Sequence, residues 1–145
     1  MKKYAIVLSL VVLAGCASSN QNGGPAVQMH ITGTNLNTNT LYFRGPMTAA
    51  LEMTITNPTA DTITLRSLDL RTTGGGPFSL RTGTTAVNKT IPPNSNATLT
   101  MSAWGRSAGG YFASSEPIYI RGLAYFESPH GAFTRMFNDV ITPGQ

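Results

Sequence analysis

Apolar and polar residues alternate with a period of two over most of the chain after residue 26. Every second residue is apolar in three runs: Val27–Ile31, Leu51–Ile55 and Ile63–Leu65. This alternation predicts half-buried β-strands. Leu68 and Leu70 continue the third run in the opposite phase, which predicts a β-bulge near Ser67.

The rest of the chain favours the same secondary structure. Further strands are predicted over Leu99–Ala103, Pro117–Phe126 and Ala132–Ile141, with a weaker one around Phe78–Leu80. The segments Asn57–Asp61 and Pro92–Asn96 have the composition of turns. We therefore expect an all-β fold, an immunoglobulin or fibronectin type III-like sandwich of about seven antiparallel strands. The side chains expected to face inward are those of Leu51, Met53, Ile55, Ile63, Leu65, Leu99, Met101, Ile118, Ile120 and Phe126.

The first sixteen residues have a different pattern. Lys2 and Lys3 precede an uncharged, mostly apolar run that is too short to cross a bilayer, as in a signal peptide. Leu13-Ala14-Gly15-Cys16 resembles a bacterial lipobox, and Cys16 is the only cysteine. We expect cleavage before Cys16 and acylation of its thiol. An ordinary secretory leader with an incidental cysteine is the alternative.

These features divide the chain into a signal peptide over 1–15, a lipidated and flexible tether over 16–25, and a sandwich domain over 26–145. Acyl chains on Cys16 would hold the protein on a membrane. Ala17 stands where Gram-negative sorting would require Asp for inner-membrane retention. By that resemblance we expect the periplasmic face of the outer membrane, or the outer surface of the plasma membrane in a Gram-positive host.

Charge and cysteine content bear on the expected partners and on how the fold is stabilised. The net charge of the whole chain is +4, and it falls to +2 once Lys2 and Lys3 leave with the leader. No clustered basic surface is expected, so nucleic acid is not an expected partner. With its one thiol acylated, the mature domain can form no disulfide, so the core must stabilise it.

No catalytic, metal or cofactor constellation stands out. His30 lies on the polar phase of the first strand, and His130 falls in a predicted hairpin turn. A triad of His130, Asp139 and a serine can be drawn, but no serine lies in a Gly-x-Ser-x-Gly elbow. Two distant histidines give no metal-ligand spacing. Gly74-Gly75-Gly76-Pro77 lacks the lysine and helix of a phosphate loop and is expected to connect two strands.

The segment Trp104–Phe112 is the one place where a ligand is expected, if anywhere. It is glycine-rich and carries the only tryptophan together with Arg106 and Tyr111, so we expect a loop at one end of the sandwich. These three side chains form an exposed platform for a glycan or peptide. The alternative is that Trp104 and Phe112 plug the open end of the sandwich while Arg106 stacks on one of them. We expect Trp104 to be structural and Tyr111 dispensable for folding, with the role of Arg106 open.

Three stretches resemble the late-embryogenesis-abundant type 2 family and the related water-stress and hypersensitive-response (WHy) domain. They are the strand ending in Asn57-Pro58, the Ile91-Pro92-Pro93 turn with the strand after it, and the strand centred on Gly122 with the turn that follows it. The resemblance covers roughly residues 49–137. It implies a single immunoglobulin-like sandwich with a stress-protective or scaffolding role, and it brings no catalytic residues.

The resulting expectation is a non-enzymatic, membrane-anchored lipoprotein of the cell envelope with a binding or protective role. Its partner would be an envelope protein or a glycan. The alternative is an accessory lipoprotein of an envelope assembly or secretion machine that recruits its partner by adding a strand to a sheet edge. A hydrolase built around His130 is the third and least favoured hypothesis.

Overall fold

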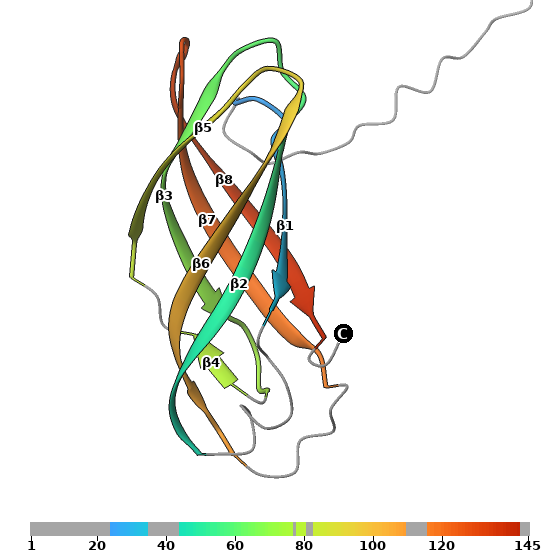
Figure 1. Ribbon diagram of the computed structural model, residues 1–145, viewed down its shortest axis with the longest axis vertical. Coiled ribbons are helices and arrows are strands. Elements are labelled where there is room, and N and C mark those ends of the chain that lie inside the picture. The colour runs from blue at the N-terminus through green and yellow to red at the C-terminus, as the bar shows by residue number, and fades with distance from the viewer. Residues whose placement is uncertain (1–23, 35–43, 77, 81–82, 110–115, 143–145) are drawn as a thin grey trace, which may run out of the picture.

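A computed structural model describes residues 24–34, 44–76, 78–80, 83–109 and 116–142 of the chain. Within these ranges the fold is a β-sandwich of two antiparallel four-stranded sheets (Figure 1). One sheet has the order β1-β2-β6-β4 and the other the order β5-β3-β7-β8. The strands are β1 (Gln28–Gly33), β2 (Gly45–Asn57), β3 (Ile63–Thr72), β4 (Phe78–Leu80), β5 (Thr85–Ile91), β6 (Ser95–Ser107), β7 (Ile118–Ser128) and β8 (Gly131–Ile141). The described ranges contain no apolar helix of membrane-spanning length.

The core lies between the two sheets, and the alternating pattern places its side chains. In β2, every second residue from Met47 to Asn57 is buried. Eight of the ten residues expected to face inward are buried, which confirms the predicted phase. The other two, Leu99 and Met101, pack against the core but stay half-buried.

The bulge predicted near Ser67 is confirmed. In both pairings of β3 the register shifts between Leu65 and Ser67. Leu65 pairs with Phe126 of β7 and Ser67 pairs with Tyr125, so the residue between Leu65 and Ser67 has no paired residue on β7. This extra residue reverses the alternation and brings both Leu65 and Leu68 into the core.

Two expectations about element bounds are corrected. The sandwich has an eighth strand, β5, which alternation does not reveal because it is an edge strand with one buried residue, Ile91. The strand expected over Leu99–Ala103 is longer, and β6 continues through Trp104 to Ser107. The first part of the expected loop at Trp104–Phe112 is therefore strand.

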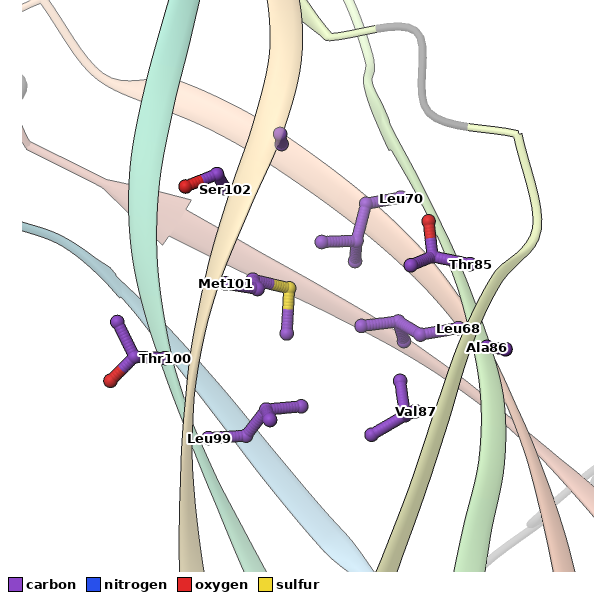
Figure 2. Close-up of a pocket in the computed structure, with 10 residues that line it drawn as sticks. Leu68, Leu70, Thr85, Ala86, Val87, Leu99, Thr100, Met101 and Ser102 are labelled. Atoms are coloured by element: carbon purple, nitrogen blue, oxygen red, sulfur yellow. The ribbon is translucent and has the colours of Figure 1, made fainter.

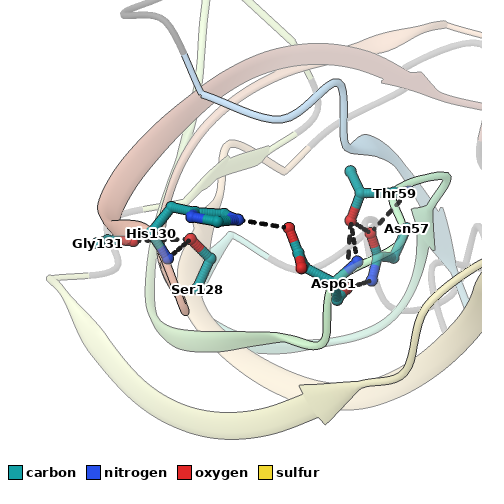
Figure 3. Close-up of polar contacts among 6 residues, drawn as sticks. All are labelled: Asn57, Thr59, Asp61, Ser128, His130 and Gly131. Carbon is teal, nitrogen blue, oxygen red and sulfur yellow. Dashed lines mark hydrogen bonds and ion pairs between the residues drawn. The ribbon is translucent and has the colours of Figure 1, made fainter.

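One end of the sandwich is fastened by Asn57, a fully buried polar residue in a core position of β2 (Figure 3). Its side-chain amide donates to the carbonyl oxygens of Asp61 (2.8 Å), Pro92 (2.9 Å) and Ile91 (3.2 Å). Its Oδ1 accepts from the hydroxyl of Thr59 at 2.7 Å. The two predicted turns, which begin 35 residues apart in sequence, are thus tied together by the Asn57 side chain.

Gly122 has a packing role in β7. A Cβ at this position would lie 2.1 Å from the ring of Phe137, its cross-strand neighbour on β8. Phe137 is buried, so the absent side chain leaves room for its ring. The glycine at the centre of the β7 strand therefore serves close packing within this sheet.

Candidate functional site

Trp104 and Arg106 lie on the outer face of the β1-β2-β6-β4 sheet. Ala103 and Ser107 on the same strand are buried, so strand alternation turns residues 104 and 106 outward. The Trp104 side chain is 69% exposed. The expectation that Trp104 plugs the end of the sandwich is therefore wrong. Tyr111, the third residue of the expected patch, and Phe112 lie outside the described residues, as does Cys16.

The strands on either side complete this surface. Trp104 pairs with Thr48 of β2, and Arg106 pairs with Pro46 of β2 and Ser79 of β4. We call Trp104, Arg106 and Ser79 the outer patch. Together with Gly105 they line a shallow depression. An exposed indole beside a guanidinium and a hydroxyl can stack on a sugar or peptide plane and donate hydrogen bonds to it.

Gly105 explains why this segment resembles a loop in sequence but folds as strand. A Cβ on Gly105 would lie 2.7 Å from the backbone oxygen of Ser79. The glycine therefore permits the close approach of β4 to β6, at a point where any side chain would push the strands apart. Its role is sheet pairing, with no requirement for chain flexibility.

A second depression adjoins the outer patch and adds positive charge. Arg106 lines both the depression beside Trp104 and a neighbouring cleft. This cleft is also lined by Arg44 and by the loop Gly74–Gly76. That loop joins β3 to β4, as expected for an inter-strand connection. The described residues that line this cleft include two arginines and no acidic residue. Anionic groups, such as carboxylates or phosphates, are the chemistry that two guanidiniums prefer.

The two histidine side chains lie against separate carboxylates, and among the described residues no serine hydroxyl is hydrogen-bonded to either imidazole. His30 Nδ1 lies 2.7 Å from Asp139 Oδ2, and the same oxygen accepts from the backbone N–H of Ile31 at 2.6 Å. His130 Nε2 lies 3.1 Å from Asp61 Oδ2 (Figure 3). The catalytic triad of His130, Asp139 and a serine that the sequence allows is not formed, because Asp139 pairs with His30.

Both histidine pairs join elements that are distant in sequence. The Asp139 contacts link β8 to the edge strand β1 across 108 residues. The His130 contact links the β7–β8 turn to the turn after β2. His30 is exposed, as its polar phase predicts. Among the described residues, no three His, Cys, Asp or Glu side chains gather as metal ligands would.

The sequence gives no sign of a third feature, an apolar cleft between β5 and β6 (Figure 2). Its volume is about 190 Å³. Leu99 and Met101 of β6 face Leu68 of β3 and Val87 of β5 across it. The cleft exists because β5 and β6 follow one another in sequence but belong to different sheets, and they diverge from their shared turn (Figure 1).

Solved structures share this fold at low sequence identity. The Northeast Structural Genomics Consortium target SoR45 is similar with a TM-score of 0.56 and 16% identity, over 81% of this chain and 88% of that chain. The putative ApaA protein from Bordetella pertussis is similar with a TM-score of 0.53 and 13% identity, over 82% of this chain and 93% of that chain. At these identities the likeness concerns the fold alone. No family model matches the sequence, and a comparison with curated proteins also found no match.

Proposed function

We propose that the protein is a non-enzymatic binding module of the bacterial cell envelope, held on a membrane by a lipid on Cys16. In this proposal it captures an envelope protein or glycan through the outer patch. The observation that carries it is the exposure of Trp104, which is the largest side chain on an otherwise small and polar face of β6. Large exposed aromatics beside an arginine are enriched where proteins bind partners.

The proposed anchor rests on the lipobox and on the arrangement of the domain's first residues. The Arg135 guanidinium of β8 donates through Nε to the carbonyl oxygen of Pro25 at 2.7 Å, and its Nη2 contacts the carbonyls of Gly24 and Pro25. Arg135 is 4% exposed, so this contact is part of the folded domain. A tether that starts at Cys16 would meet the sandwich at the end that carries the β7–β8 turn.

A stress-protective role of the kind seen in the late-embryogenesis-abundant and WHy proteins belongs to the same proposal. Two of the three stretches that carry the resemblance meet in space, because Asn57 donates to the carbonyls of Ile91 and Pro92. This contact gives the shared Asn-Pro and Ile-Pro segments a common structural purpose. It supports a sandwich end similar to theirs.

A second candidate function is that of an accessory lipoprotein, which recruits a partner by strand addition. The observation that favours it is the side of β6 that faces away from β2. Within the described residues, that side has a partner strand only over Gly105–Ser107, where β4 pairs with it. The remainder of this edge offers backbone groups for a further strand.

Site-specific photocrosslinking in cells tests the leading proposal. A photoreactive residue at position 106 should give a discrete crosslinked product with the full-length, lipidated protein. The same residue at position 138, which is exposed on β8 in the other sheet, is the control and should give much less. Trp104→Ala should reduce the product from position 106 without changing the amount of protein. Equal crosslinking from both positions, or none from position 106, would contradict binding through the outer patch.

A further inference from the structure

The two sides of the sandwich are closed differently. On one side, the edge strands β1 and β8 are linked by Asp139, whose Oδ2 accepts from the backbone N–H of Ile31 at 2.6 Å. On the other side, between β5 and β6, the apolar cleft remains open, and three apolar side chains at its mouth, Val87, Leu99 and Met101, are half-buried. The core is therefore incompletely covered on this side.

Along this opening, the side of β6 that faces away from β2 has no partner strand among the described residues. The N–H of Thr34 donates to the carbonyl of Ala50, so the backbone groups of Ala50 are directed at β1. Ser102 of β6 is paired with Ala50, and the two residues form a non-hydrogen-bonded pair. The N–H and C=O groups of Ser102 are therefore directed away from β2. By the same alternation the N–H and C=O groups of Asn96, Thr98 and Thr100 are directed away from β2. No described strand pairs with them there.

The facing edge of β5 carries features that discourage strand pairing, and the free edge of β6 does not. Lys89 of β5 pairs with the fully buried Leu65, so an exposed lysine stands at an inward-phase position of this edge strand. Asn88 has a φ of 56° and lies where the β3–β5 register shifts. Inward charges and bulges are common protections of sheet edges. From Ser95 to Trp104, β6 has no charged residue and no proline.

β4 already shows what fits beside β6. Its three residues run antiparallel to β6, with Phe78 and Leu80 buried and Ser79 exposed. They pair only with the last three residues of β6. The open cleft lies beside the preceding part of β6, in the direction of Asn96. At about 190 Å³ the cleft is smaller than the roughly 300–1,000 Å³ of small-molecule sites, and it suits one or two inserted side chains.

We propose that an extended segment of a partner protein adds to β6 along Asn96–Ser102 and continues the line of β4. Its apolar side chains would alternate, so that those opposite Leu99 and Met101 enter the cleft and those between them face solvent. A second copy of this chain fits less well, because its β6 already directs its own apolar face into its own core. This inference rests on the second candidate function, strand addition, and is independent of the outer patch.

Charge selects among such segments. Residues 83–107 contain no Asp or Glu, and Lys89 and Arg106 are their charged residues. A segment that carries acidic residues beside its apolar alternation would therefore be favoured over a basic one.

Peptide binding to the full-length protein tests the proposal. The probe is a synthetic peptide long enough to pair with β6 along Asn96–Ser102. In its sequence valine alternates with threonine, and an aspartate stands at each end. We expect it to bind roughly tenfold or more tightly than a peptide of the same composition whose valines are contiguous. It should slow the exchange of the Thr98 and Thr100 amides, and exchanging its aspartates for lysines should weaken binding.

Three variants keep the result interpretable. Thr100→Pro removes an outward N–H without touching the pairing with β2, and Met101→Lys places a charge in the cleft. Each should abolish peptide binding, while Thr100→Lys, which adds the same charge on the outer face one residue away, should not. Thermal melts report whether each variant folds.

Four outcomes would overturn the proposal. Two concern binding: equal affinity for the two peptides, and undiminished binding to both blocking variants. Two concern amide exchange: protection of β1 or β5 amides in place of β6, and protection of β6 without peptide that increases with protein concentration. The last would identify a second copy as the occupant. Trp104→Ala should leave peptide binding unchanged. A failure at the outer patch and a failure at the β6 edge are thus distinguishable.

Discussion

Asn57 contributes to stability in a way that its residue type alone would not suggest. It occupies a core position at the end of β2, and all of its hydrogen-bonding capacity is used within the two turns that it joins. Asn57→Ala would leave buried and partly buried carbonyl groups without a donor. We expect the free energy of unfolding to fall by about 2–4 kcal/mol, because each such group costs about 1–3 kcal/mol when unsatisfied.

Chemical denaturation of Asn57→Ala measures this loss. Asn96→Ala, at an exposed asparagine on the neighbouring strand, is the control and should change the unfolding free energy by less than about 0.5 kcal/mol. Asn57→Asp tests the donors specifically, since it keeps the acceptor for Thr59 and removes the amide N–H groups. Stability close to that of the unchanged protein in Asn57→Asp would contradict this role.

Leu65 and Trp104 provide a contrast between a buried and an exposed large side chain. Leu65 is fully buried at the bulge, so Leu65→Ala should lower the unfolding free energy by about 2–5 kcal/mol. Trp104→Ala should change it by about 1 kcal/mol or less, because the side chain is 69% exposed and lies on a strand surface. Parallel melting curves of the two variants measure both effects. A loss for Trp104→Ala equal to that for Leu65→Ala would restore the plug hypothesis.

At the scale of elements, Asp139 fixes β1 against β8. The carboxylate accepts from the Ile31 N–H and pairs with His30, so one side chain serves two neighbouring residues of an edge strand. Asp139→Ala should speed exchange of the Ile31 amide by roughly tenfold or more, because a hydrogen bond to a charged group contributes about 1.5–3 kcal/mol.

Hydrogen exchange followed by NMR resolves this local effect. The Met53 amide, in the middle of the same sheet, is the internal reference and should keep its rate. Asp139→Asn retains an acceptor oxygen and should fall between the unchanged protein and Asp139→Ala. If the Ile31 rate is the same in all three proteins, Asp139 does not hold β1.

The elements also show where sequence patterns carry information and where they do not. Alternation places β2, β3 and β7 correctly, because strands buried on one face must alternate. It misses β5, whose edge position leaves most of its residues exposed. It misplaces Trp104, because the neighbouring Gly105 indicates a loop. In the structure this glycine lies in a strand and permits the close approach of β4.

The candidate sites were less predictable than the strands. The outward position of Arg106 follows from strand phase, once β6 is known to reach that far. The pairing of His30 with Asp139 depends on which edges of the two sheets meet, and no local pattern encodes it. The same is true of the cleft, which arises because β5 and β6 belong to different sheets.

At the scale of the whole molecule, the proposed anchor makes a direct prediction. Cys16→Ser should prevent acylation and stop processing at the lipobox, because the thiol is the acyl acceptor. Membrane fractionation after a salt wash, together with mass spectrometry of the intact chain, measures both effects. A Cys16→Ser protein that stays with the membrane, with no acyl mass on the unchanged protein, would contradict the anchor.

The anchor also predicts which end of the sandwich faces the membrane. The first described residues, Gly24 and Pro25, lie beside the β7–β8 turn and line a depression together with His130. This is also the end of Asn57, which pairs with Ser95 at the start of β6. Trp104 lies nine residues further along β6, or about 30 Å at roughly 3.3 Å per residue. The outer patch would then point away from the lipid surface, toward partners in the surrounding compartment.

Trp104 is the only tryptophan, which makes this orientation measurable by energy transfer. With acylated protein on vesicles that contain dansyl-labelled lipid headgroups, transfer from Trp104 should be weak. Moving the tryptophan to the turn, as Trp104→Phe with His130→Trp, should raise transfer several-fold, because the eight residue-to-residue steps from Cys16 to Gly24 span about 28 Å at most. Cys16→Ser versions of both proteins supply the unanchored baseline. Stronger transfer from position 104 than from position 130 would mean that the outer patch faces the membrane, and the proposed outward capture of a partner would fail.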